Sequence, residues 1–447
     1  KNRNEMKKSL LSIIIGLSVV GAAVAQRRPE VWTLKNCIDF AQQNNTTVRT
    51  RAVQVDQNSN DLSTARFSRL PDLNASVGYN VSFGRGTSDD NTYKTQTLQT
   101  GSFDVSASMP LFQGLRINRT IKGGKLDLAA AMQDLERARE DVAVNVMTLY
   151  LQVLYNKELV IVAEHQLALS TQQAERSREL VAAGKQPESA LYESEALAAN
   201  DALALTQARN DLQLALLDLS QAMNRESADG FDIASPDLDP LLNNALSQRP
   251  DADAIYDYAA ENRPHIRAER IRLESSENAI AIARSSLYPS LSLRGGYGTG
   301  IYSSMDSDFW PQFRHNSSEF VGVSLSIPIF NRRTVRGNIR SAQLSAQRQQ
   351  LALLDAEQSL RKAIEQAGYN TEAASAKYRA AVAALAAAET AFAYEEQKAA
   401  AGRSTVFDFN DAKTRMEKAQ SELVQSKFEL VFRRKILDYY HGEPLTL

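Results

Sequence analysis

The sequence predicts a mainly α-helical protein that also contains β-strands suited to a membrane barrel, and three observations support this fold class. The stretch from Pro110 to Gly184 has no internal proline and repeats its apolar residues in heptads, as coiled coils do. Four other segments alternate apolar with small polar residues. The N-terminus has the pattern of a secretory signal. A helix of about 70 residues would be roughly 105 Å long, so we expect an elongated architecture.

Residues 1–25 are predicted to form a signal peptide, in which residues 1–5 are extra residues upstream of Met6. Two lysines precede the apolar run 10–20, and Ala23-Val24-Ala25 supplies a cleavage site of small residues. The alternative is a buried or membrane-anchoring helix, although the run is too short to span a bilayer. Gln26 follows the cleavage site where a lipid anchor would need cysteine, so we expect no lipid anchor.

Composition argues against several classes of function. The formal net charge is −2, and it becomes about −5 once residues 1–25 are removed, with no basic stripe for nucleic acid. Cys37 is the single cysteine and is expected on a helix face. The four histidines are far apart in sequence and lack ligand spacing. No nucleophile motif or phosphate-binding glycine loop is present. We therefore expect no enzyme activity, no metal and no cofactor.

The chain contains an internal two-fold repeat with a shift of 218 residues. Three pairs of anchors share this shift: Pro71 and Pro289, Pro110 and Pro328, and Gly184 and Gly402. The first repeat is assigned to 26–226 and the second to 251–447. Residues 227–250, rich in Pro, Asp and Asn, are predicted to be a linker in the equatorial region.

Each repeat contributes two predicted strands, at about 73–84 and 101–112 in the first and about 290–301 and 319–330 in the second. Each strand has one apolar face and one face of small polar residues. A soluble sheet packed on one side would show the same alternation. The signal peptide and the lack of another apolar layer to cover the sheet favour a transmembrane barrel. The loops 84–100 and 302–317 are then expected to face the cell exterior.

The remaining residues are predicted to be long helices. They are expected at about 48–70, 114–183, 188–223, 264–288, 331–401 and 404–440. In the helix 114–183 the apolar seam comprises Leu128, Leu135, Val142 and Leu149 on one register, with Met132, Val146, Val153, Val160 and Leu167 on the other. Because four strands cannot close a barrel, several copies must combine, and two copies would supply eight strands and three copies twelve.

These modules resemble the outer membrane efflux proteins of the TolC family over essentially all of the mature length. The resemblance rests on the two modules of helix, Pro, strand, loop, strand, Pro-Leu/Ile-Phe and helix. It also rests on Trp32-Thr33-Leu34 before Cys37-Ile38, and on the run Ala-Gln-Gln-Asn-Asn at 41–45. The most specific piece is residues 402–412, Gly-Arg-Ser-Thr-Val-Phe-Asp-Phe-Asn-Asp-Ala, which is similar to the lower helical turn of that family.

The resemblance implies a homotrimer in which four strands per protomer form one 12-stranded barrel, continuous with an α-helical periplasmic tunnel. It implies the outer membrane of a Gram-negative bacterium as location, and a periplasmic adaptor and an inner-membrane pump of the RND, ABC or MFS type as partners. The expected function is export of small molecules or polypeptides through a tripartite efflux or type I secretion system. The alternative is a non-transporting coiled-coil interaction protein. Prolines at the barrel–helix junctions would be Pro71, Pro110, Pro289 and Pro328.

The resemblance also implies a constriction at the periplasmic mouth lined by Asp408 and Asp411, with Glu193 at the position of the first repeat that matches Asp411. Rings of these acids would attract cations. The alternative is helix capping, since Thr405 precedes Asp408 by three residues. This chain departs from the family pattern at Ala190, which occupies the position that matches Asp408.

Two turns at the tips of the helices are the implied contacts with the adaptor. The first comprises Gly184, Lys185 and Gln186, and the second comprises Gly402, Arg403 and Ser404. The base of the second turn, Arg403, lies one residue earlier than in the family pattern, with Ser404 in the usual place. Both glycines also fit ordinary helix caps, and the two roles are compatible.

Overall fold

The computed structural model describes residues 30–87, 92–247, 251–303, 308–401 and 403–447, so the predicted signal peptide lies outside the described residues. The described chain forms two compact units. The sheet unit comprises residues 47–140 and 252–366. The hairpin unit comprises residues up to 46, 141–251 and 367–447. Each unit draws on both halves of the sequence, so the compact units do not follow the division into repeats 26–226 and 251–447.

Most of the described residues are helical, and the bounds of the helices are as follows. They are α2 (Leu34–Asn44), α3 (Thr46–Phe67), α4 (Arg116–Ala182), α5 (Glu188–Ala222), α6 (Asp239–Ser247), α7 (Ala252–Asn262), α8 (Pro264–Ser285), α9 (Phe309–His315), α10 (Thr334–Ala400) and α11 (Val406–His441). The six long helices begin and end within three residues of the predicted ranges. The short helices α6, α7 and α9 are additional to that prediction.

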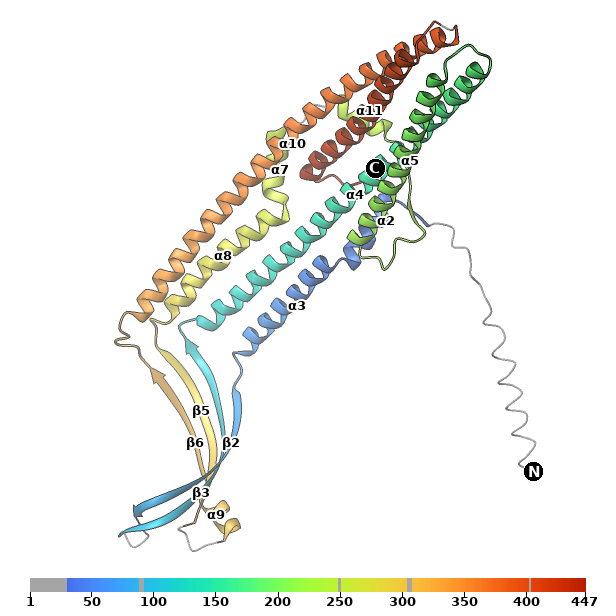
Figure 1. Cartoon of the computed structure of the whole chain (residues 1–447). Helices are drawn as coiled ribbons and strands as arrows, with labels where there is room; N and C mark the ends of the chain where they lie inside the picture. The colour runs from blue at the N-terminus through green and yellow to red at the C-terminus, as the bar shows by residue number, and fades with distance from the viewer. Residues whose placement is uncertain (1–29, 88–91, 248–250, 304–307, 402) are drawn as a thin grey trace, which may run out of the picture. The chain divides into compact units, whose positions relative to one another are not determined.

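The sheet unit contains an antiparallel sheet of four strands in the order β2-β3-β5-β6 (Figure 1). The strands are β2 (Asp72–Thr87), β3 (Tyr93–Gln113), β5 (Ser290–Tyr302) and β6 (Ser318–Ser326). Each strand is joined to one helix, namely α3, α4, α8 and α10, and of these α4 and α10 continue past residues 140 and 366 into the hairpin unit. In a single chain β2 and β6 are edge strands, so their outer N–H and C=O groups have no strand partner within the described sheet.

Three expectations about the strands need correction. The segment 84–100 is not simply a loop, because β2 and β3 remain paired as far as Thr87 and Tyr93; threonines and Tyr93 favour strand there. The segment 302–317 is also not simply a loop, because it contains the helix α9. Phe313 of α9 packs against Phe103 of β3, with 5.4 Å between the ring centroids. Strand β6 ends at Ser326, before Pro328, since proline has no N–H to donate to a ladder.

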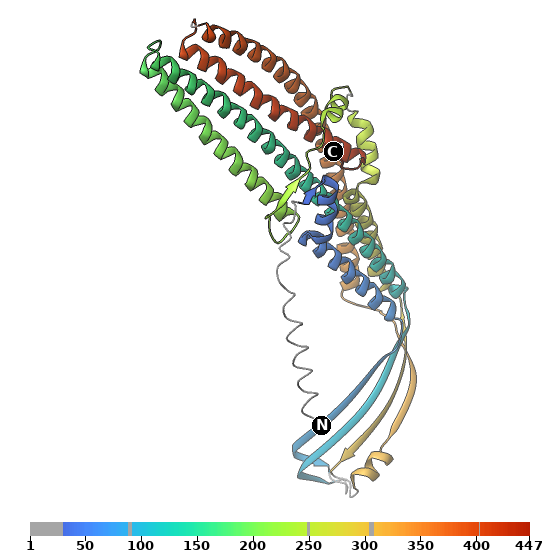
Figure 2. The ribbon, with the colours of Figure 1, turned by 90° about the vertical axis from the view of Figure 1, so that its right-hand side faces the viewer.

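The two faces of the sheet differ as the alternation predicts. Residues at odd positions on the edge strands are apolar and more than 60% exposed: Leu73, Val77, Tyr79 and Phe83 on β2, and Val321 and Val323 on β6. The opposite face carries small residues, and Asp104 lies over Gly298 there. Figure 2 shows the four strands running together from the helices. Within the described residues only α9 covers part of the apolar face, beside Phe103 and Thr299.

The hairpin unit consists of two helical hairpins, one made of α4 and α5 and the other of α10 and α11 (Figure 2). Its core lies along the middle of α4, where Val146, Val153 and Tyr150 are almost completely buried. The predicted seam is correct at Val142, Val146 and Val153. It is wrong at Met132, which belongs to the sheet unit and is half exposed. Around Tyr150 the helix is buried on more than one side, and this explains why its pattern is broader than a heptad seam.

The predicted linker 227–250 takes part in this core. Strand β4 (Phe231–Ile233) pairs in parallel with β1 (Glu30–Trp32), and the Tyr150 hydroxyl donates to the carbonyl oxygen of Ala234 at 2.7 Å. Cys37 lies on α2, as expected from its neighbours, and is fully buried. Burial raises the pKa of its thiol to about 12. The linker is therefore an ordered part of the hairpin unit as far as Ser247.

A glycine makes the turn from β3 into α4. Gly114 has a φ of +59°, and a Cβ atom at this position would lie 2.6 Å from the carbonyl oxygen of Ser285 and 2.9 Å from the Cβ of Tyr288. Gly184, which follows α4, also has a positive φ, of +67°. A Cβ atom at Gly184 would have no other atom within 4 Å. Both backbones favour glycine, but only Gly114 is also enclosed.

We predict that Gly114→Ala lowers the free energy of unfolding by at least about 3 kcal/mol, because it combines left-handed backbone strain with atomic overlap. Gly184→Ala should cost only about 1 kcal/mol, since it has the strain without the overlap. Guanidinium unfolding followed by helical circular dichroism measures both values. Equal losses of unfolding free energy in the two variants would show that overlap with Ser285 and Tyr288 does not destabilise Gly114→Ala.

Candidate functional site

The two hairpin turns end their first helices with the same backbone motif. After α4, the N–H of Lys185 donates to the carbonyl oxygen of Leu180, and that of Gly184 donates to Val181. After α10, the N–H of Arg403 donates to Lys398. The bond that spans six residues, from Lys185 in one hairpin and Arg403 in the other, is the signature of a Schellman cap. Both turns therefore place an exposed basic residue at the equivalent position.

The other residues of the predicted turns lie as follows. Gln186 and Ser404 are partly buried, whereas Gly184 is exposed. Gly402 lies outside the described residues. The Ser404 hydroxyl donates to Glu395 of α10 at 2.5 Å, and Lys398 pairs with the same carboxylate at 2.8 Å. These two bonds hold the pKa of Glu395 below its usual value. Ser404 thus fastens the second turn to α10.

Asp408 takes part in capping α11. The N–H of Asp408 donates to the Thr405 hydroxyl at 3.1 Å, and that hydroxyl donates to an Asp408 carboxylate oxygen at 2.7 Å. The carboxylate is exposed and lies in the first turn of α11, where the helix dipole favours an anion. The first hairpin lacks this arrangement, because Pro187 is the N-cap of α5 and Ala190 stands at the position matching Asp408.

Asp411 and Glu193 lie on different helices. Asp411 is on α11, where its carboxylate is partly exposed and pairs with Arg415 at 2.8 Å. Glu193 is exposed on α5. Among the described residues no contact joins Glu193 to Asp408 or Asp411 within one chain. The predicted acidic residues are therefore available at the protein surface, and a single chain does not bring all three together.

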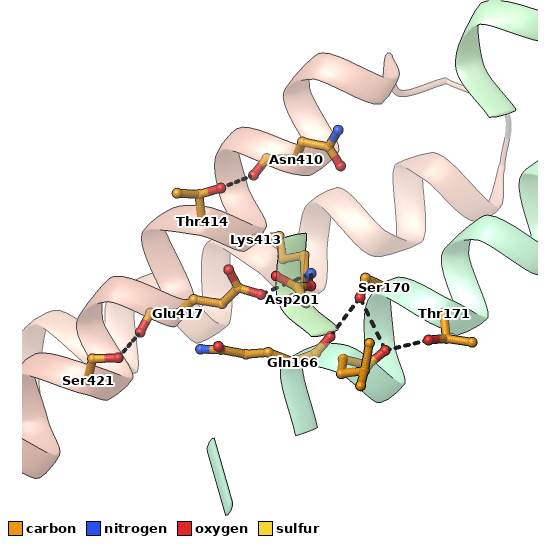
Figure 3. A network of polar contacts seen from close by, with 10 residues as sticks. Gln166, Ser170, Thr171, Asp201, Asn410, Lys413, Thr414, Glu417 and Ser421 are labelled. Atoms are coloured by element: carbon orange, nitrogen blue, oxygen red, sulfur yellow. Dashed lines mark hydrogen bonds and ion pairs between the residues drawn. The ribbon is translucent and has the colours of Figure 1, made fainter. Parts of the chain in front are cut away.

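A buried ion-pair network joins the two hairpins close to these acids, at Lys413, which follows Asp411 by two residues and Asp408 by five. Figure 3 shows the Lys413 ammonium of α11 between two carboxylates. It lies 2.6 Å from Asp201 of α5 and 3.0 Å from Glu417 of α11. The Lys413 side chain is 1% exposed, and those of Asp201 and Glu417 are 12% and 15% exposed. This contact is a charged link between α11 and α5.

The network has one more negative than positive charge. Burial raises the pKa of Glu417, and the neighbouring Asp201 raises it further, while Lys413 opposes both effects. Lys413 is the cation that both carboxylates contact, so its loss would leave them buried without a counter-charge.

Sequence reasoning did not identify this network. One signal was present, because Lys413 follows the buried Phe409 by four residues and so lies on the apolar stripe of α11. The partner could not be inferred, since Asp201 is 212 residues away in sequence.

The four prolines occupy three kinds of position. Pro71 and Pro289 immediately precede β2 and β5. Pro328 lies two residues after β6 ends. Pro110 is inside β3, where the pairing with β5 shifts register between Pro110 and Phe112. The expectation that Pro110 lies at the junction is therefore corrected: it coincides with a bulge, which a residue without an N–H tolerates, and the helix begins six residues later.

The chain is similar to known proteins in both sequence and fold. A family model described as "Outer membrane efflux protein" matches residues 37–225 and 255–433. The outer membrane efflux protein BepC of Brucella suis is 22% identical over 89% of this chain and 83% of its own length. The outer membrane protein TolC of Vibrio cholerae is 21% identical, over 92% and 91%. The solved structure of CusC superposes with a TM-score of 0.77 at 18% identity and covers 96% of each chain.

We predict that Lys413→Ala lowers the free energy of unfolding by about 3–5 kcal/mol, because Asp201 and Glu417 would remain buried without their counter-charge. Lys418→Ala is the matched control on the same helix. Its ammonium lies 4.0 Å from Glu422 and is largely exposed, so the loss should stay below about 1 kcal/mol. Urea unfolding monitored by circular dichroism measures both variants. Similar values for the two lysines would contradict a special role for Lys413.

Proposed function

Because this chain belongs to the outer membrane efflux protein family, we propose that three copies assemble into one export duct across the outer membrane. The match of the family model covers most of the chain, and the fold is that of solved outer membrane channels of this family. The chain is an outer membrane efflux protein, and the family serves transport and not catalysis. The assembly, its strand number and its partners are the proposed part.

The observation that carries the proposal is the sheet with an exposed apolar face and two open edges. Residues such as Val77 and Val321 would lose contact with water in lipid, at about 25 cal/mol for each Å² of apolar surface buried. The edges β2 and β6 cannot stay unpaired in lipid, since no water is there to accept or donate hydrogen bonds. Pairing β2 of one copy with β6 of the next removes every edge.

Three copies are the smallest ring that both pairs all sheet edges and leaves a duct. Each chain supplies four strands, so closed rings of two, three or four copies contain eight, twelve or sixteen strands. Eight strands enclose a space filled by side chains, so a dimer would leave no duct. Twelve strands enclose a wider lumen. The start positions of β2 and β5, α3 and α8, and α4 and α10 all differ by 218 residues, which supports an internal duplication and hence near six-fold symmetry within a trimer.

At the periplasmic end we propose that Asp408 and Asp411 line the constriction, with Glu193 beside them from the first repeat. Both aspartates are on the first turns of α11, and their carboxylates retain access to solvent. The cap formed with Thr405 is compatible with this role, because it fixes the orientation of the Asp408 carboxylate without neutralising its charge. Three-fold repetition would make rings of negative charge, which attract cations.

The tips are the proposed contacts with a periplasmic adaptor, and the pump is of the RND, ABC or MFS type. Lys185 and Arg403 are exposed at equivalent caps of the two hairpins, so a trimer would present six similar basic turns. Gly184, Gln186, Gly402 and Ser404 complete these turns. The alternative of a non-transporting coiled-coil protein is not favoured, because the relatives are outer membrane efflux proteins.

We predict that the mature protein, extracted in detergent and corrected for bound detergent, has the mass of three chains. The physical reason is that only ring closure pairs both sheet edges. Light scattering with refractive-index and absorbance detection measures the mass. Two chains would contradict the 12-stranded barrel, and a monomer that stays soluble without detergent would contradict the membrane location of the sheet.

We predict that the double variant Asp408→Asn/Asp411→Asn changes the single-channel conductance and lowers the cation-over-anion permeability ratio by at least about twofold, because it removes two rings of charge. Asparagine keeps a carbonyl oxygen that can accept from Thr405, so the cap should persist. Planar-bilayer recordings measure both quantities. The control is Glu422→Gln, an exposed acid further along α11. Unchanged conductance and selectivity in the double variant would overturn the constriction.

A further inference from the structure

Basic residues gather where the strands of the sheet unit meet its helices. The segments 62–71, 114–126, 278–289 and 331–354 together contain twelve Lys and Arg residues and no Asp or Glu. The whole chain, in contrast, has a net charge of −2. All four segments belong to the sheet unit. Positive charge is therefore concentrated where the strands of the sheet unit join its helices.

The register of the sheet brings these segments together. Gln113 pairs with Ser290, and Ser290 pairs with Ser326, so the ends of β3, β5 and β6 lie in one row. The Arg69 guanidinium, just before β2, donates to Asn118 at the start of α4 at 2.7 Å. We call the basic residues of this row the basic collar. It comprises Arg66, Arg69, Arg116, Arg119, Lys122, Lys125, Arg284, Arg332, Arg333, Arg336 and Arg340.

The strongest part of the collar is the start of α10. Arg332, Arg333, Arg336 and Arg340 are all exposed, and among the described residues none of their guanidinium groups is paired with a carboxylate. Arg332 and Arg333 immediately precede α10, and Arg336 and Arg340 are four residues apart within it, so the latter two like charges lie on one side of the helix and repel one another. Arg332 and Arg333 also have φ values of 50° and 65°, a backbone that favours Gly or Asn. Local structure thus gives no reason for arginine at these sites.

Three carboxylates close to these segments in sequence have other partners or pair with one collar residue. Asp72 accepts from the N–H of Ser108 at 3.1 Å, Asp127 accepts from Ser275 at 2.7 Å, and Glu274 pairs with Lys122 at 2.8 Å. The exposed guanidinium groups of Arg332, Arg333, Arg336 and Arg340 therefore remain available to an external anion.

Exposed aromatic residues accompany the collar at each of the four junctions. Phe67 precedes β2, Phe112 lies near the end of β3, Tyr288 precedes β5 and Phe330 follows β6. Each is at least 44% exposed, and Phe330 is 83% exposed. Aromatic rings next to basic side chains are typical of the level of lipid headgroups, where the ring lies at the acyl boundary and the cation reaches the phosphate.

From these observations we propose that the basic collar binds the phosphate groups of anionic phospholipids in the periplasmic leaflet of the outer membrane. This inference rests on the proposed function, which places the sheet in the membrane and the helices in the periplasm. Arg332, Arg333, Arg336 and Arg340 supply the main binding charge. Arginine suits this partner because its planar guanidinium donates two parallel hydrogen bonds to one phosphate.

The test compares binding of dioleoylphosphatidylglycerol and dioleoylphosphatidylcholine to the detergent-extracted full-length assembly by native mass spectrometry. The wild type should bind the phosphatidylglycerol at least about tenfold more tightly, and added salt should reduce this preference. The quadruple variant R332Q/R333Q/R336Q/R340Q should lose most of the preference. The matched control R178Q/R209Q/R415Q/K418Q removes four exposed positive charges from surface ion pairs of the hairpin unit, and should keep the preference.

Equal affinity of the wild type for the two lipids would overturn the proposal. So would an unchanged preference in the quadruple variant, or an equal loss in the control. Single-channel recording of the same preparations separates this outcome from failure of the proposed function. A wild type that conducts but shows no lipid preference refutes only the collar, whereas a wild type that forms no channel refutes the export duct.

Discussion

The constraint on which the rest of this structure depends is that a four-stranded sheet cannot satisfy its own edges. The backbone groups on the outer sides of β2 and β6 have no partner in one chain, and in lipid each unpaired group costs several kcal/mol. The ring of copies proposed above would pair these groups. The helices α3, α4, α8 and α10 are each joined to one strand of this sheet, so the same ring would also bring the helices of the copies together.

The hairpin unit uses charge in two different ways. At the tips, Asp408 is exposed, and its hydrogen bond with Thr405 fixes the orientation of the carboxylate. Beyond the tips, Lys413 is buried between Asp201 and Glu417 and joins α11 to α5. Surface charges of the first kind contribute little to stability, whereas removal of one partner of the second kind leaves a buried charge without compensation.

The sheet unit shows a third use of charge, at its boundary with the helices. Strands that face lipid can carry few ionisable groups, and the junctions are the first positions where charged side chains reach headgroups. Arg332 and Arg333 take this position even though their backbone would favour smaller residues. The aromatic residue at each junction, such as Tyr288 or Phe330, extends the apolar face to the same level. In the proposed binding of phospholipid headgroups, the residues next to the strand ends would set the depth of the protein in the membrane.

Much of this protein was determined by its sequence alone, because the relevant patterns are local. Heptads and proline positions predict the six long helices to within three residues, and alternation predicts the strands and their two faces, since both depend on periodicity within one element. Only the tertiary structure decided what depends on distant partners. It extended β2 and β3 into the expected loop 84–100 through cross-strand pairing, and it placed Pro110 inside a strand at a bulge. It also brought Asp201 to Lys413 across 212 residues, a contact that no local pattern encodes because packing of the two hairpins creates it.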